Sequence, residues 1–247
     1  MLETKNLTIR FGGHVAVDRV SCAFEPGTLT AIVGPNGAGK TTYFNLISGQ
    51  LPATQGEVWL DGENLSRLSA PLRTRKGLGR AFQLTQLFPM LTVLENVRLA
   101  AQARAGVGLR MLSVWRSHRE LIDEAMALLE RVRLQSRAQE RAASLPHGDQ
   151  RKLEVAVLMA LKPKVYLFDE PTAGMSVDEV PVVLDLIREL KREGASTLLL
   201  VEHKMDVVRE LADRIVVLHQ GALVADGVPS EVMASDVVQQ AYLGVAA

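Results

Sequence analysis

A glycine-rich segment, GPNGAGKT at residues 34–41, has the residue types and spacing of a phosphate-binding loop. Glycines allow the backbone N–H groups of such a loop to turn toward phosphate oxygens. Lys40 can place a positive charge on the β- and γ-phosphates of a nucleotide, and the Thr41 hydroxyl can ligate Mg²⁺. The segment follows an apolar strand pattern and begins a helical one, which is the context that this motif requires. We therefore predict nucleotide contacts from Gly34, Pro35, Asn36, Gly37, Ala38, Gly39, Lys40, Thr41 and Thr42.

A second group of polar side chains follows two apolar strand patterns farther along the chain. VYLFDE, residues 165–170, ends in two carboxylates, and strand alternation places them on different faces. Asp169 suits a partner of Mg²⁺, commonly through water, and Glu170 suits a base that polarises the attacking water. His203 follows the strand pattern STLLLVE. Because the carboxyl ends of parallel strands lie at one edge of a sheet, His203 is expected to contact the γ-phosphate or to hold the site's geometry.

Three further candidates have weaker signals. Gln83, in GRAFQLTQLFP, could contact Mg²⁺ and the nucleophilic water, although alone it would be an ordinary loop glutamine. Phe11, in the turn IRFGG, could stack on an adenine ring; the alternative is a half-buried turn aromatic. Val17 is placed with Phe11 among the predicted nucleotide-binding residues.

These residues need a scaffold of alternating strands and helices. Short strand patterns separated by Gly-rich turns occupy the first sixty residues, and helical character follows from about residue 91 to 139. Thr92 and Glu95 predict a capping box at the start of that region. The continuous apolar runs before Glu170 and His203 are typical of parallel strands covered on both faces. The predicted fold class is α/β, with a parallel-sheet core, an N-terminal antiparallel β layer and an inserted α-helical subdomain.

Composition limits the classes of partner. The chain has 247 residues, and its 28 Lys+Arg and 28 Asp+Glu give a net charge of zero. This balance disfavours a nucleic-acid partner and unaided attachment to an anionic membrane. The single cysteine, Cys22, excludes an internal disulfide and fits a reducing compartment. Because we find neither a signal-peptide pattern nor an apolar run long enough to span a bilayer, we expect a cytoplasmic chain.

Five ordered motifs, GPNGAGKTT, Gln83, GDQRKLE, LFDEPTAG and the histidine of LLLVEH, together resemble the ATP-binding subunit of an ABC transporter. The resemblance covers essentially the whole chain. It implies a P-loop NTPase of ABC type forming one domain over residues 1–247. A RecA-like core would occupy residues 1–87 and 161–247, and a helical subdomain about 88–160. Glu170, His203 and Gln83 would be catalytic, and Thr41, Gln83 and Asp169 would serve Mg²⁺.

The same resemblance implies ATP and Mg²⁺ as cofactors and a set of protein partners. A second ATPase subunit would pair head to tail with this one, as a homodimer or a heterodimer. Membrane-spanning permease subunits would hold the chain at the inner face of the cell membrane, and a solute-binding protein would complete the complex. A short permease helix is expected in a groove between Gln83 and the helical insert.

Finer details, among them RFGGHVAVDRV, VEHKMDVV and GVPSEVMASDVVQQAYLG, resemble the longer ATPase of branched-chain amino acid importers. This implies an ATPase that powers import of branched-chain or other amino acids. The alternatives are a urea or amide importer, a lipopolysaccharide-type exporter, a soluble ABC ATPase not linked to transport, a P-loop kinase and a nucleotide binder that does not hydrolyse.

The signature segment departs from the family's LSGGQ, because this chain has LPHGD at residues 145–149. The resemblance implies that this segment acts on the partner's ATP. Loss of the serine hydroxyl removes one hydrogen bond to a charged group, worth about 1.5–3 kcal/mol. Backbone N–H groups at the helix start can still receive an anion. We interpret the signature as weakened but working, the alternative being an inactive one. Its residues are Pro146, His147, Gly148, Asp149 and Gln150.

Ser176 is a second departure. It stands where the family usually has an aspartate that crosses the dimer interface. Ser176 and Glu179 also predict a capping box for the following helix, and the two roles are compatible.

Overall fold

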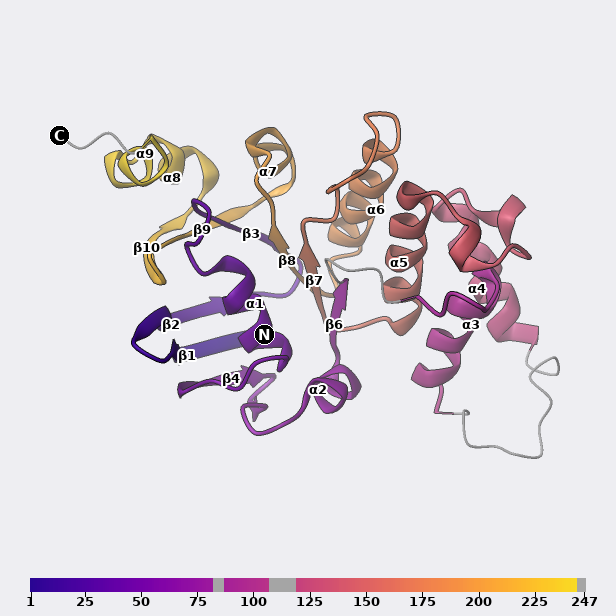
Figure 1. Ribbon diagram of the computed structural model, residues 1–247, viewed down its shortest axis with the longest axis horizontal. Helices are drawn as coiled ribbons and strands as arrows, with labels where there is room; N and C mark the ends of the chain where they lie inside the picture. Colours follow the sequence, from indigo (N-terminus) through magenta and orange to yellow (C-terminus); the bar gives the residue numbers. More distant parts are fainter. Residues whose placement is uncertain (82–86, 107–118, 244–247) are drawn as a thin grey trace. The chain divides into compact units, whose positions relative to one another are not determined.

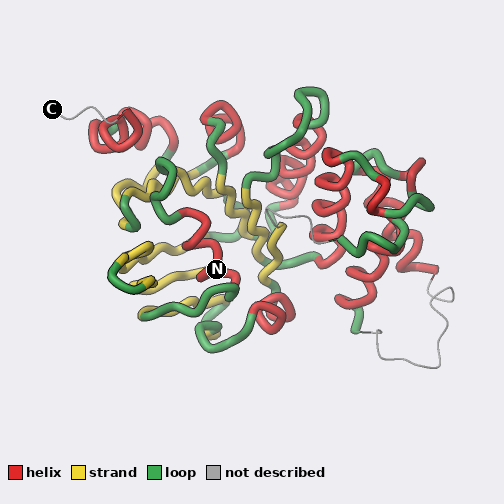
Figure 2. The backbone as a smooth tube through the Cα atoms, in the orientation of Figure 1, coloured by secondary structure: helices red, strands yellow, loops and turns green. Residues whose placement is uncertain are grey.

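The computed structural model describes residues 1–81, 87–106 and 119–243, which form two compact units. Unit 1 contains Met1–Leu78, Lys164–Glu170 and Leu190–Ala247, and unit 2 contains Gly79–Pro163 and Pro171–Glu189. Figures 1 and 2 show the strands and helices of each unit. Gln83 lies outside the described residues. Within the described ranges, no helix has the length and apolar character needed to cross a bilayer.

An antiparallel sheet in unit 1 has the strand order β2-β1-β4-β5. Its strands are β1 Leu2–Phe11, β2 His14–Phe24, β4 Gln55–Leu60 and β5 Glu63–Asn64. Phe11 pairs with His14 across a two-residue turn, where Gly12 has a φ of 58°. Glycine is the residue that adopts such a φ without steric cost. The predicted N-terminal antiparallel layer is confirmed, and its first hairpin brings Phe11 and His14 together.

A second sheet has the strand order β10-β9-β3-β8-β7-β6. Its strands are β3 Leu29–Val33, β6 Leu78–Ala81, β7 Val165–Asp169, β8 Thr197–Val201, β9 Arg214–His219 and β10 Ala222–Gly227. β3 is parallel to β8 and β9, β7 is parallel to β8, and β10 is antiparallel to β9. Every residue of β3, β7 and β8 is buried, which explains their uninterrupted apolar character. The predicted parallel core is therefore confirmed.

The two sheets of unit 1 share a core around helix α1, Lys40–Ser48. Tyr43 and Phe44 of α1 are fully buried among residues of both sheets, and Figure 1 shows α1 between β3 and the β1–β2 hairpin. A smaller core covers the other face of the parallel sheet, because Val33 and Ala31 point away from Ile32. Three short helices cover that face: α7 Met205–Leu211, α8 Pro229–Ala234 and α9 Asp236–Leu243.

Unit 2 is mainly helical. It contains α3 Val93–Arg104, α4 Arg119–Arg131, α5 His147–Leu161, the 3-10 turns Gln135–Arg137 and Ala142–Ser144, and the larger part of α6 Val180–Glu193. The predicted capping box is confirmed: Thr92 Oγ1 accepts the N–H of Glu95 at 3.1 Å, and Glu95 Oε2 accepts the N–H of Thr92 at 2.8 Å.

An ion-pair cluster joins the three main helices of unit 2. Arg104 at the end of α3 donates to both carboxylate oxygens of Glu124 in α4, at 2.9 and 2.6 Å. Lys162, which caps α5, lies 2.7 Å from the same carboxylate. Hydrogen bonds from Arg104, followed by that from Lys162, lower the pKa of Glu124 to about 2 against the opposing effect of burial.

Two short elements escape sequence-based prediction. Helix α2, Ala70–Lys76, and edge strand β6 are short and carry no periodic apolar pattern. The guanidinium of Arg73 holds α2 in place by donating to the carbonyls of Leu46 and Ile47, both at 2.7 Å. Both carbonyls belong to the last turn of α1, where that of Leu46 also accepts the N–H of Gly49 at 3.3 Å.

Candidate functional site

The loop between β3 and α1 can adopt its shape only with glycine at certain positions. Gly34, Gly37 and Gly39 have positive φ values of 151°, 80° and 98°. A Cβ on Gly34 would lie 2.1 Å from the carbonyl oxygen of Leu218, and one on Gly39 would lie 2.4 Å from that of Ala16. Both contacts are with backbone, which cannot move aside cheaply. Packing therefore requires glycine at positions 34 and 39, and the backbone conformation favours glycine at position 37.

Lys40 is held over this loop by main-chain acceptors. Its Nζ donates to the carbonyl oxygens of Gly34 at 2.7 Å and Pro35 at 2.9 Å, and the residue is only 6% exposed. Burial lowers the pKa of Lys40, while the charges of Glu170 and Asp169 oppose that effect. A phosphate oxygen is a stronger acceptor for an ammonium group than a neutral carbonyl. Lys40 is thus positioned for an anion that enters the loop.

A cavity of about 430 Å³ opens over the loop, entirely within unit 1. Phe11 lines it with a residue exposure of 50%, so an aromatic face is available. Of the predicted residues, Gly34, Pro35 and Asp169 are not among those that line it. The lining residues are Phe11, His14, Ala16, Asn36, Gly37, Ala38, Gly39, Lys40, Thr41, Thr42, Glu170 and His203.

Val17 does not line this cavity. Val17 is fully buried in the core behind the loop, and it is not part of the cavity wall. His14 and Ala16 line the cavity instead. Period-two alternation along β2 puts residues 14 and 16 on one face and residue 17 on the other.

Glu170 and His203, predicted to meet at the ends of neighbouring strands, do so. His203 Nε2 lies 2.9 Å from Glu170 Oε1. Glu170 has a φ of 49°, and its N–H donates to the carbonyl of Val201 at 2.9 Å. Glu202 Oε2 accepts the N–H of His203 at 3.0 Å. A non-glycine residue with positive φ is a sparsely populated conformation, of the kind that gathers at functional sites.

The oxygen donors near the loop suit Mg²⁺ held mainly by phosphates and water. Thr41 supplies a hydroxyl at the start of α1, and Asp169 supplies a carboxylate at the buried end of β7. Among the described residues, no group of three or more His, Cys, Asp or Glu side chains could hold a metal ion. Mg²⁺ usually takes one or two protein ligands together with substrate phosphates. The donor set therefore fits Mg²⁺ that arrives with a nucleotide.

The signature segment begins helix α5 in unit 2. Pro146 is the N-cap, with φ −54° and ψ 156°, and no side chain caps the helix. Pro146 therefore stands one position before the first helical residue, His147. Asp149 pairs with Lys152 at 2.8 Å and Arg137 at 3.2 Å, and Gln150 Nε2 donates to the carbonyl of Leu145 at 2.9 Å.

The loop that follows Glu170 packs on the start of α5, within unit 2. The N–H and hydroxyl of Ser176 donate to Glu179 Oε2 at 3.1 and 2.9 Å, and these bonds lower the pKa of Glu179. The carboxylate half of the predicted capping box is therefore present, whereas the N–H of Glu179 goes to the carbonyl of Ser176 and not to its hydroxyl.

The Glu179 carboxylate also fills the space beside Gly148. A Cβ on Gly148 would lie only 2.1 Å from Glu179 Oε2, and Lys152 Nζ lies 3.7 Å from Glu179 Oε1. In the same way, a Cβ on Gly174 would lie 3.1 Å from the His147 ring. These contacts join residues about thirty positions apart, and no local pattern in the sequence indicates them.

Comparisons with known proteins agree with this geometry. The family model described as ABC transporter matches residues 17–173. The high-affinity branched-chain amino acid transport ATP-binding protein BraF of Pseudomonas aeruginosa is 40% identical over 253 residues, which cover 100% of this chain and 98% of that protein. LivG of Escherichia coli (strain K12), with the same description, is 38% identical over 251 residues, with coverage of 100% and 98%. A crystal structure of the ADP conformation of MJ1267, an ATP-binding cassette of an ABC transporter, has a TM-score of 0.84 at 30% identity and covers 99% of both chains.

Proposed function

Since the chain belongs to the ABC transporter family, we propose that it is the ATP-hydrolysing subunit of an importer for branched-chain or other amino acids. The observation that carries the catalytic part is the Glu170–His203 pair at the wall of the cavity over the phosphate-binding loop. The amino-acid part is supported by the descriptions of BraF and LivG, which match this chain over its full length.

ATP binds in this proposal with its phosphates over residues 34–41 and its adenine on Phe11. The loop glycines turn backbone N–H groups toward the phosphate oxygens, and Lys40 exchanges its carbonyl partners for them. Phe11 supports adenine by stacking, which tolerates loose geometry and therefore suits a residue at the end of a hairpin.

Hydrolysis depends on how Glu170 and His203 are held. Glu170 orients a water molecule toward the γ-phosphate, and the His203 imidazole fixes the Glu170 carboxylate through their 2.9 Å contact. The bond from the Glu170 N–H to Val201 maintains the unusual backbone conformation. Thr41 and Asp169, with Gln83, would hold Mg²⁺, which neutralises charge on the phosphates when it is bound.

Two sets of partners complete the proposal. A second ATPase subunit pairs head to tail, so that the start of α5 with its Pro146–Gln150 signature acts on the partner's ATP. Permease subunits hold the chain at the cytoplasmic face of the membrane, and a solute-binding protein delivers the solute. A small cavity of about 120 Å³ in unit 2, lined by Ala81, Leu87 and Leu158 among others, supports a docking groove beside the helical insert.

The Glu170→Gln variant tests the catalytic assignment. Glutamine keeps the size of the side chain but is not a base, so ATP binding should persist while the hydrolysis rate falls about 10²- to 10⁴-fold. The exposed Glu25→Gln change in the same unit is the matched control and should hydrolyse ATP at the wild-type rate. Wild-type turnover in Glu170→Gln would refute the assignment. Uptake of labelled leucine by vesicles containing the permease subunits would then test the solute.

A further inference from the structure

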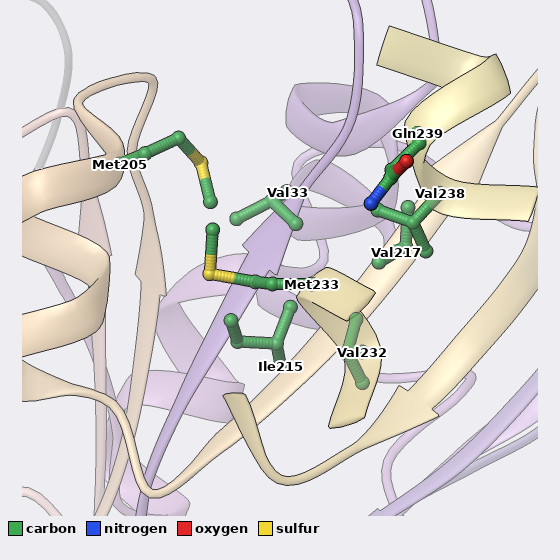
Figure 3. A pocket seen from close by; sticks show the side chains of 8 residues that line it. All are labelled: Val33, Met205, Ile215, Val217, Val232, Met233, Val238 and Gln239. Carbon is green, nitrogen blue, oxygen red and sulfur yellow. The ribbon is translucent and has the colours of Figure 1, made fainter. Parts of the chain in front are cut away.

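A second cavity, of about 200 Å³, lies in unit 1 between the parallel sheet and the C-terminal helices. Figure 3 shows the methyl ends of Met205 from α7 and Met233 from α8 facing each other across it. β3 and β9 contribute Val33, Ile215 and Val217, and α9 contributes Val238. This cavity shares no residue with the one over the phosphate-binding loop.

The wall of this cavity is aliphatic and thioether, with the amide of Gln239 as the polar exception among its lining residues. An apolar cavity of about 150 Å³ is known to remain dry and to bind benzene, so a compact group of five or six carbons would fit here. The two methionines are unbranched and polarizable, and they can adjust to such a group. The lining therefore favours a ligand with a small aliphatic group.

A cation contacts one of the methionines that line the cavity, and this sulfur is a poor partner for it. Arg209 Nε donates to Met233 Sδ at 3.4 Å, and the exposed Arg209 forms no ion pair with any residue in the described part of the chain. A thioether sulfur is a weak acceptor, whereas a carboxylate forms a charge-assisted hydrogen bond with a guanidinium. We propose that this cavity binds a compact aliphatic monocarboxylate, with its hydrocarbon chain among the methionines and valines and its carboxylate at Arg209.

The walls of the cavity continue directly into the ATP site. Val33 precedes Gly34, and Val217 precedes Leu218, whose carbonyl packs against Gly34. Met205 lies two residues after His203. A ligand that shifts these walls therefore changes ATP affinity, and ATP changes the ligand's affinity by the same factor. This coupling rests on the proposed function, whereas binding of the carboxylate does not.

The test uses full-length protein carrying ¹³C-methyl methionine, with the Met205 and Met233 signals assigned from single Met→Leu variants. Titration with 4-methylpentanoate should shift both signals saturably, with a Kd on the order of 1 mM for a ligand of this size. Leucine should bind more weakly, because its ammonium group would lie beside the Arg209 guanidinium. The Arg209→Gln change should weaken 4-methylpentanoate about tenfold or more and leave 4-methylpentan-1-ol unaffected.

Neighbouring valines on α9 provide matched variants. Val238 lines the cavity and is 7% exposed, whereas Val237 is 53% exposed. Val238→Trp, or Val238→Phe where tryptophan prevents folding, should abolish the methionine shifts, and Val237→Trp should preserve them. Absence of shifts in the wild-type chain, equal binding by the filled variant, or equal binding of leucine would overturn the proposal. Bound carboxylate should change ATP affinity about fivefold or more, and an unchanged affinity would overturn the coupling alone.

Discussion

Replacing Pro146 with serine would restore the hydroxyl that this chain lacks in its signature segment. Pro146 caps α5 with φ −54° and ψ 156°, a backbone conformation that serine adopts freely, so the change leaves the helix start in place. Proline offers no side-chain hydrogen bond there. A serine hydroxyl could accept an N–H from Gly148 or Asp149 and at the same time donate its own proton to a phosphate of the partner's ATP.

The change is expected to affect the free energy of unfolding much less than ATP-driven dimerisation. The new cap should stabilise the chain by about 1 kcal/mol, and loss of the rigid proline should destabilise it by about 0.4–1 kcal/mol through the unfolded state. These effects nearly cancel. A hydrogen bond to the charged phosphate adds about 1.5–3 kcal/mol at each of the two sites of a homodimer, so ATP-driven dimerisation should strengthen about 10²- to 10⁴-fold.

Sedimentation equilibrium with ATP measures that gain, in a Glu170→Gln background that prevents hydrolysis. Pro146→Ala is the matched control, because it removes the proline without adding a hydroxyl. Urea unfolding of the three proteins should give similar free energies. If the serine and alanine variants dimerise equally, the hydroxyl makes no contact and the reasoning fails. If only the serine variant dimerises at all, the native signature is inactive and not merely weakened.

Three further changes have outcomes that the packing determines. Gly39→Ala should abolish ATP binding and destabilise the chain by about 1–3 kcal/mol, because the new Cβ would lie 2.4 Å from a backbone oxygen. The control is Gly13→Ala, which has open space around it and should have little effect in the same ATP-binding and urea-unfolding assays. Glu124→Gln should lower the free energy of unfolding by about 1 kcal/mol at pH 7, a value that allows for solvent screening of a partly exposed pair. Because the folded pKa of Glu124 is depressed to about 2, this difference should disappear as the pH falls from about 4.5 toward 2, and a constant difference would contradict the assignment. Gly148→Ala should cost about 1–3 kcal/mol in the wild-type background and much less with Glu179→Ala, which a double-mutant cycle measures.

The parts of the fold that could be predicted from the sequence are those with a local cause. The strands β3, β7 and β8 are apolar throughout because both faces are covered, and the glycine loop lies between a strand and a helix. The meeting of Glu170 with His203 followed from parallel neighbours ending at one edge. The side chain of Val17 lies in the core because alternation along β2 places it on the face opposite His14 and Ala16.

The features that could not be predicted have long-range causes. Helix α2 has little amphipathic pattern of its own. It is held in place by hydrogen bonds from the Arg73 guanidinium to two carbonyls of α1, which lie 26 and 27 residues earlier in the chain. The polar contact between Glu179 and the start of α5 likewise depends on a loop folding back onto a distant helix. In one case a charged side chain donates to backbone carbonyls, and in the other it fills the space beside a glycine. Only the tertiary structure brings these groups together.

The Glu179 contact also affects whether the signature residues can be taken as evidence of ATP binding. Gly148 matches a glycine of LSGGQ, yet the Glu179 carboxylate leaves no space for a Cβ there, so packing within the chain is enough to require glycine. His147 occupies a glycine position of LSGGQ, and its ring lies against Gly174 of the same loop. The presence of Gly148 is therefore no independent sign of a phosphate contact, and the presence of His147 is no sign against one. Residue 146 differs from both, because its side chain caps nothing within the chain. A gain in ATP-driven dimerisation on placing serine there that exceeds the effect of the new helix cap, about 1 kcal/mol, would identify a phosphate at the start of α5.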